Sequence, residues 1–126
     1  MTYSAWIGVD MPLTDKYPFR PDLRARLIDV ASRGDTINYL DLGAGRAMIG
    51  RYLYRIALEE ATAGRPPLTA VAVRKDVGLP GAGFREAMIA AGFITNAEEQ
   101  DEEAVWERAL RETHEYWRPK LRDDLK

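Results

Sequence analysis

Five cations in the middle of the chain are its best candidates for chemistry: Arg46, Arg51, Arg55, Arg74 and Lys75. The first three fall near one exposed side of a stretch whose apolar residues recur with helical spacing. The other two follow a short β-branched run and precede several glycines, which places them at the tip of a turn. Guanidinium and ammonium groups bind phosphate oxygens. We therefore predict a phosphate-contacting surface for double-stranded DNA.

The charge balance leaves a second interpretation of these cations open. Residues 41–94 carry seven basic and five acidic side chains, whereas residues 95–126 carry six and ten, within a net charge of −2. A dedicated DNA-binding domain is usually more basic. Surface Lys and Arg are normal in any soluble protein. The five cations could equally be solvated residues, some of them paired with Glu59, Asp41 or Asp76.

Cysteine and histidine usage excludes several reaction classes. The chain has no cysteine, which excludes thiol nucleophiles, disulfides and thiolate metal sites. Its single histidine, His114, cannot form a multi-histidine metal site and has no evident Ser or Cys partner. We therefore predict no catalytic residue, no metal and no cofactor, and a non-enzymatic protein.

Two motifs resemble parts of enzyme active sites, but a non-catalytic structural role is predicted for each. The segment from Tyr39 to Gly45 resembles the first glycine-rich motif of S-adenosylmethionine-dependent methyltransferases, but 126 residues are too few for their large sheet. Glu59 and Glu60, followed by Lys75, could belong to a nuclease site, in which acidic residues surround a metal ion and a lysine lies close by. Glu60, however, lies along the apolar face, where pairing with an arginine at the edge of the core is the expected role. A plain turn and an ion pair are therefore predicted.

Hydrophobic spacing and turn formers define the elements that would carry these residues. The predicted elements are a helix from Pro21-Asp22 to Gly34, a short strand near Ile37–Leu40, a helix from Arg46 to about Ala63, a strand at Leu68–Val73, a return segment at Leu79–Phe84, a helix from Phe84 to Gly92, and a last helix from about Asp101 to Trp117. Asp41 is a plausible N-cap, and Pro119 is expected to stop the last helix.

This order predicts an α+β, winged-helix-like fold. It is mainly helical, with a small two- or three-stranded β wing and an added C-terminal helix. Residues 1–21 would form an extended aromatic arm, residues 22–118 a single domain and residues 119–126 a tail. The chain has no apolar run near the ~20 residues of a membrane helix, and its N-terminus does not read as a signal peptide. A cytoplasmic protein without membrane contact is expected.

Four segments carry a resemblance to a known family: Thr36-Ile-Asn-Tyr-Leu-Asp-Leu-Gly, Met48-Ile-Gly-Arg-Tyr-Leu, Pro66-Pro-Leu-Thr-Ala-Val-Ala-Val and Gly81-Ala-Gly-Phe. Over about residues 35–93 the chain resembles the DNA-binding half of alkyltransferase-like proteins, and also small proteins of phages and restriction loci. The resemblance implies a groove-facing long helix and a regulatory or phage-defence role. The reactive Pro-Cys-His-Arg segment of the alkyltransferase family has no counterpart in this chain, so alkyl transfer is excluded.

The last predicted helix supports an alternative function. Trp106 and Trp117 lie on its apolar stripe, where they would either close the core against the first helix or form a face for a protein partner or a second copy. The second possibility describes a winged-helix-like adaptor or inhibitor that binds another protein. The sequence therefore predicts a DNA-binding protein, with a protein-binding adaptor as the alternative.

Overall fold

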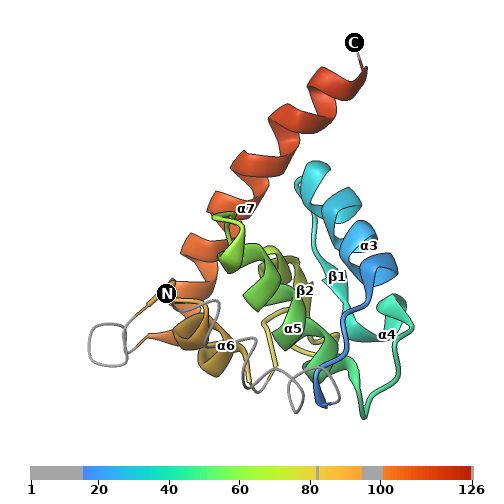
Figure 1. Cartoon of the computed structure of the whole chain (residues 1–126), viewed down its shortest axis with the longest axis vertical. Coiled ribbons are helices and arrows are strands. Elements are labelled where there is room, and N and C mark those ends of the chain that lie inside the picture. Colours follow the sequence, from blue (N-terminus) through green and yellow to red (C-terminus); the bar gives the residue numbers. More distant parts are fainter. Residues whose placement is uncertain (1–15, 82, 95–100, 126) are drawn as a thin grey trace.

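The computed structural model describes residues 16–81, 83–94 and 101–125, with side chains as far as residue 118. Over these residues the domain is mainly helical, as predicted (Figure 1). The elements are α3 (Pro21–Ser32), β1 (Ile37–Asn38), α4 (Tyr39–Leu42), α5 (Ile49–Thr62), the 3-10 helix η1 (Leu68–Val71), β2 (Ala72–Val73), α6 (Phe84–Ala90) and α7 (Glu102–Leu125). The predicted first helix, short strand and long helix appear as α3, β1 and α5, and the single turn α4 takes the place of the second half of the strand predicted near Ile37–Leu40.

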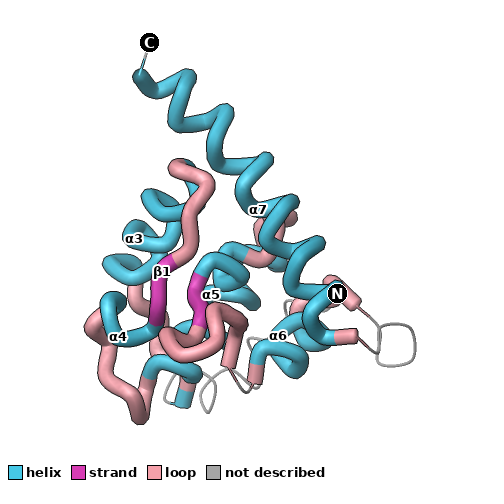
Figure 2. The backbone as a smooth tube through the Cα atoms, turned by 180° about the vertical axis from the view of Figure 1, so that it is seen from behind, coloured by secondary structure: helices cyan, strands magenta, loops and turns pink. Residues whose placement is uncertain are grey.

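The two described strands pair in parallel, so they do not form the predicted wing. β1 and β2 run in the same direction, with Ile37 opposite Ala72 and Asn38 opposite Val73. The two strands lie side by side (Figure 2). A wing is a hairpin, whose strands are antiparallel. The predicted strand Leu68–Val73 is wrong in its first four residues, which form η1. All six residues are buried, and a short apolar run buried on every side does not distinguish a strand from a helical turn.

The segment after β2 forms a tight turn. The amide of Arg74 donates to the carbonyl of Leu79 at 2.7 Å, and the amide of Gly78 donates to the carbonyl of Arg74 at 2.9 Å. No strand follows among the described residues of the predicted return segment, where Pro80 has no amide hydrogen to donate to a ladder. Arg74 and Lys75 therefore sit on a compact turn.

Two of the predicted helix starts need correction. Gly45 has a φ of +83°, and residues 46–48 form a turn, so α5 begins at Ile49 and Arg46 lies just before it. The N-cap of α4 is Asn38, whose side-chain oxygen accepts from the amide of Asp41 at 3.0 Å. Asp41 itself, predicted as a cap, lies in the first turn of α4.

The last helix continues past its predicted stop. α7 runs from Glu102 to Leu125 and includes Pro119. Proline removes one hydrogen bond and strains the turn before it, but a long helix can continue with hydrogen bonds on either side. The C-terminal turns of α7 stand clear of the remaining helices (Figure 1), and none of the described helices is long and apolar enough to cross a membrane.

Two packed clusters form the core, and α7 covers both. The first includes Leu27 of α3, Ile56 of α5 and Leu68 of η1, and the second is centred on Met88 of α6. Trp117 packs against the first cluster and Trp106 against the second, and both residues are half-buried. The indole of Trp106 also donates to the carbonyl of Ala70 at 2.8 Å. Both tryptophans thus contact the core, one of the two predicted roles.

Candidate nucleic-acid interface

Four of the five predicted cations come together at one end of the domain. Arg46, Arg51 and Arg74 line a cavity of about 680 Å³. Arg46, Arg74 and Lys75 line an adjoining hollow of about 510 Å³. The two hollows share Tyr39, Arg46, Ile49 and Arg74. We call Arg46, Arg51, Arg74 and Lys75 the basic end.

Arg55 does not belong to the basic end, although the sequence predicted it there. Its Nε donates to Glu59 Oε2 at 2.8 Å, and its Nη1 donates to the backbone carbonyl of Tyr17 at 3.1 Å. Only 16% of its side chain is exposed. Arg55 therefore fastens the segment before α3 onto α5, and its positive charge is paired with Glu59.

The basic end keeps an excess of positive charge. Arg46, Arg51 and Lys75 are exposed, and no ion pair is recorded for them among the described residues. Arg74 pairs with Asp76 at 2.7 Å, as one interpretation of the sequence expected. Glu86 is the second carboxylate around the two hollows. Four cations thus face two acids, in a chain whose net charge is −2.

The parallel strand pair explains why these distant residues meet. Because β1 and β2 run side by side, the residues that follow them, Tyr39 and Arg74, leave the sheet at the same edge. The hydroxyl of Tyr39 accepts from the amide of Gly81 at 2.7 Å, which fixes the loop after the 74–79 turn. A Cβ on Gly81 would lie 3.0 Å from the Tyr39 ring, so the loop approaches the ring as closely as glycine allows.

We predict that Gly81→Ala will lower the free energy of unfolding by about 1 kcal/mol, because the added methyl must displace the Tyr39 ring or the loop. Urea denaturation followed by circular dichroism measures this. Gly50→Ala is the matched control: Gly50 lies within α5 with open space around it, so alanine should add about 0.5–1 kcal/mol there. A Gly81→Ala protein as stable as wild type would contradict this close contact.

Aromatic side chains line the same cavity, and the sequence analysis did not assign them to a site. They are Tyr17, Tyr39, Tyr54 and Phe84. The rings of Tyr17 and Tyr54 lie 4.8 Å apart at a tilt of 36°. Burial raises the pKa of both Tyr39 and Tyr54, so these phenols stay neutral at physiological pH. Tyr54 lies one helical turn from Arg51, and this spacing could have indicated that Tyr54 belongs to the same site.

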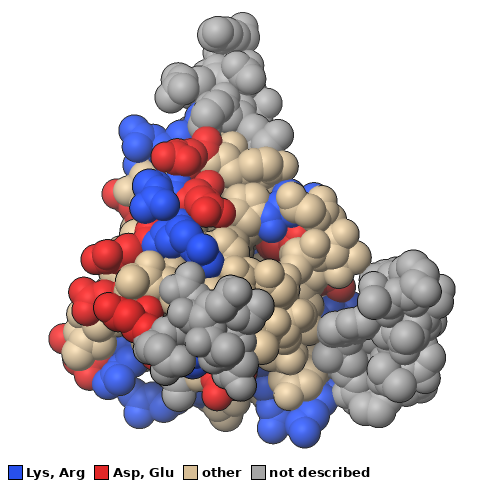
Figure 3. Space-filling model, turned by 90° about the vertical axis from the view of Figure 1, so that its left-hand side faces the viewer, with Lys and Arg blue, Asp and Glu red and all other residues tan. Residues whose placement is uncertain are grey.

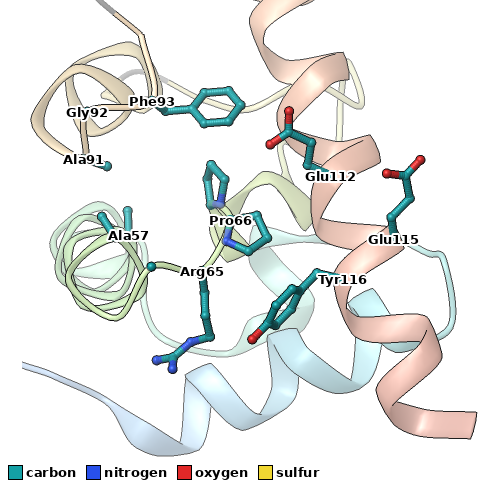
Figure 4. Close-up of a pocket in the computed structure, with 12 residues that line it drawn as sticks. Ala57, Arg65, Pro66, Ala91, Gly92, Phe93, Glu112, Glu115 and Tyr116 are labelled. Carbon is teal, nitrogen blue, oxygen red and sulfur yellow. The ribbon is translucent and has the colours of Figure 1, made fainter.

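A third hollow, of about 550 Å³, is lined by two glutamates and one arginine (Figure 4). It lies between the C-terminal end of α5, the segment after α6, and α7. Phe93 and Pro66 line it, and the carboxylates of Glu112 and Glu115 project from α7 beside it (Figure 4). Arg65 also lines this hollow, but it pairs with Glu60. Glu112 and Glu115 therefore supply control positions for tests of the basic end.

Neither acidic residue of the nuclease interpretation is available for chemistry. Glu60 is completely buried; its Oε2 lies 2.5 Å from Arg24 Nε and its Oε1 lies 2.7 Å from Arg65 Nε. The hydrogen bond to Glu60 raises the pKa of Arg65. Glu59 pairs with Arg55. The predicted pairing of Glu60 with arginine is confirmed, and it is a structural ion pair.

The glycine-rich segment also lacks the geometry of a methyltransferase motif. In such a motif a strand ends in an acidic residue before the glycines, whereas here Tyr39–Leu42 form a single helical turn. Gly43 closes this turn with a φ of +71°. The segment connects α4 to α5, which agrees with the plain turn predicted from the sequence.

Charge is mixed on the face of the molecule shown in Figure 3. On the face shown in Figure 3, Lys and Arg side chains alternate with Asp and Glu side chains over one side, beside a broad area of uncharged residues. This face therefore carries no uniform basic field.

No protein-family model, no curated protein and no solved structure matches this chain.

Proposed function

We propose that this domain is a non-enzymatic module that binds nucleic acid, with duplex DNA the first ligand to test, through the basic end. The observation that carries the proposal is the convergence of Arg46 and Arg51, around the start of α5, with Arg74 and Lys75 on a separate turn. Three of these four cations are exposed and have no recorded ion pair among the described residues. Such groups bind phosphate oxygens and release counterions from the nucleic acid.

The start of α5 adds to this attraction. This helix has 14 residues, no side-chain cap and no acidic residue in its first turn. The positive end of its dipole therefore favours an anion beside Arg46 and Arg51. The order of α3, β1, α4 and α5 supports placing α5 against a DNA groove, in the manner of helix-turn-helix proteins.

The charge count also indicates how strong the binding should be. Four cations supply few phosphate contacts, and the net charge of −2 opposes the approach of a polyanion. We therefore expect modest affinity that is strongest at low salt. Such a module would act within an assembly, or alongside a second copy, in regulatory or defence-related DNA binding.

The proposal is tested by fluorescence anisotropy with a labelled duplex at low salt. The variant Arg46→Ala/Arg51→Ala/Lys75→Ala should bind about tenfold more weakly or worse, because three exposed cations are removed. The control is Arg33→Ala, an exposed arginine that pairs with Asp29 on α3 and lines neither basic hollow. No binding by the wild type, or equal binding by the triple variant, would contradict the proposal and favour the protein-binding alternative.

Removing the acid at the edge of the cavity should have the opposite effect. Glu86→Gln is expected to strengthen DNA binding about twofold to threefold at low salt, because it removes a negative charge that repels the approaching phosphate. The same anisotropy titration measures it. Glu112→Gln, in the hollow of Figure 4, makes the same charge change at another site and should leave the affinity nearly unchanged. Equal gains from both variants would show that only net charge matters.

A further inference from the structure

The cavity at the basic end offers more than phosphate contacts. Three arginines and four aromatic side chains line one space of about 680 Å³, within the roughly 300–1,000 Å³ of small-molecule sites. Ile49, Leu53 and Ala87 add an apolar lining. An isolated phosphate would use the arginines and leave the remainder of this lining unused.

The aromatic lining suits a flat heterocycle. Tyr54 is half-buried, and its ring is already supported on one side by Tyr17, at a centroid distance of 4.8 Å. Tyr17 is in turn held by the hydrogen bond from Arg55 to its carbonyl. A ring that is fixed in this way loses little freedom when a second ring stacks on it.

Tyr39 supplies a polar group in the same cavity. Its hydroxyl oxygen accepts from the amide of Gly81, and among the described residues no acceptor is recorded for the hydroxyl hydrogen. The neutral phenol can therefore donate to a base or sugar oxygen while its ring stays in place.

We infer that this cavity receives one unstacked nucleotide, with its base among Tyr39, Tyr54 and Phe84 and its phosphate on the arginines. The inference rests on the proposed function and narrows its ligand class. In a regular duplex every base is stacked and paired, so only the phosphates and groove edges could reach the basic end. Single-stranded segments, or sites where a base leaves the stack, can also fill the cavity. The domain therefore prefers single-stranded over fully paired nucleic acid.

The test compares a labelled single strand of about 12 nucleotides with the duplex of the same sequence, by anisotropy on the whole chain. The wild type should bind the single strand about tenfold more tightly. Tyr54→Ala should lower the ratio of single-strand affinity to duplex affinity to about one, and Tyr54→Phe, which keeps the ring, should retain the wild-type ratio. Equal affinity of the wild type for both ligands, or a preference that survives in Tyr54→Ala, would overturn the inference.

A second comparison needs no protein variant. A single strand whose bases are all replaced by abasic sugar keeps its phosphates, and it should bind the wild type about tenfold more weakly than the normal strand. Equal binding would overturn the nucleotide inference and leave the phosphate proposal intact. Absence of binding to every one of these ligands at low salt would overturn the proposed function itself, so the two failures are distinguishable.

Discussion

Glu60→Gln is expected to lower the free energy of unfolding by about 3 kcal/mol. The Glu60 carboxylate is completely buried, and both of its oxygens bind guanidinium groups, one from Arg24 and one from Arg65. Glutamine keeps the volume but removes the charge and turns one acceptor into a donor that faces a guanidinium. Breaking a buried ion pair by changing one partner costs about 3–5 kcal/mol. Urea denaturation measures the loss.

Glu59→Gln provides the matched control on the same helix. Glu59 is 36% exposed and pairs with Arg55 at 2.8 Å, so its neutralisation should cost less than about 1 kcal/mol. A triple replacement of Arg24, Glu60 and Arg65 by apolar residues should cost less than Glu60→Gln alone, because no uncompensated charge remains. Equal stability losses for Glu59→Gln and Glu60→Gln would contradict the structural role of the buried carboxylate.

Trp106→Ala is expected to cost about 3 kcal/mol. Its indole packs against the cluster around Met88 and donates to the carbonyl of Ala70, a residue with no exposed surface. Replacing a large aromatic that packs on a core removes apolar contacts and leaves a cavity. The loss of the hydrogen bond leaves the Ala70 carbonyl without this donor. Thermal or urea unfolding of the variant measures the combined loss.

The variant Trp106→Phe separates the two contributions. It keeps most of the packing and loses only the hydrogen bond, so it should cost about 1–2 kcal/mol. The pair of variants also distinguishes the two predicted roles of the tryptophan stripe. If Trp106→Ala left the stability unchanged, the side chain would not be a core residue here, and a partner-binding face on α7 would become the better interpretation.

The parts of the fold that follow from local backbone chemistry were predictable. Pro21 starts α3, and Gly34 and Gly64, both with positive φ, follow the ends of α3 and α5, as their residue types indicate. The parallel pairing of β1 with β2 was not predictable, because it depends on how buried segments far apart in the sequence pack together. The continuation of α7 through Pro119 likewise has no local signal.

The candidate site was predictable in its charges and not in its shape. The choice of Arg46, Arg51, Arg74 and Lys75 followed from residue type and turn position, and they do lie together. The sequence offered Glu59 as a partner for Arg55, but it gave no sign of the second partner, a backbone carbonyl 38 residues away. The aromatic lining was missed for the same reason: Tyr17 and Tyr39 reach the cavity only through tertiary contacts. The resemblance to alkyltransferase-like proteins stays a prediction.

The most direct test of the central proposal is the salt dependence of DNA binding by the wild-type chain. Each phosphate contact contributes about 0.9 to the slope of the logarithm of the affinity against the logarithm of salt concentration. Four cations at the basic end predict a slope of about −3.6 for a duplex, and the variant Arg46→Ala/Arg51→Ala/Lys75→Ala should fall to about −0.9. A flat salt dependence, or the same slope in both proteins, would contradict binding through the basic end.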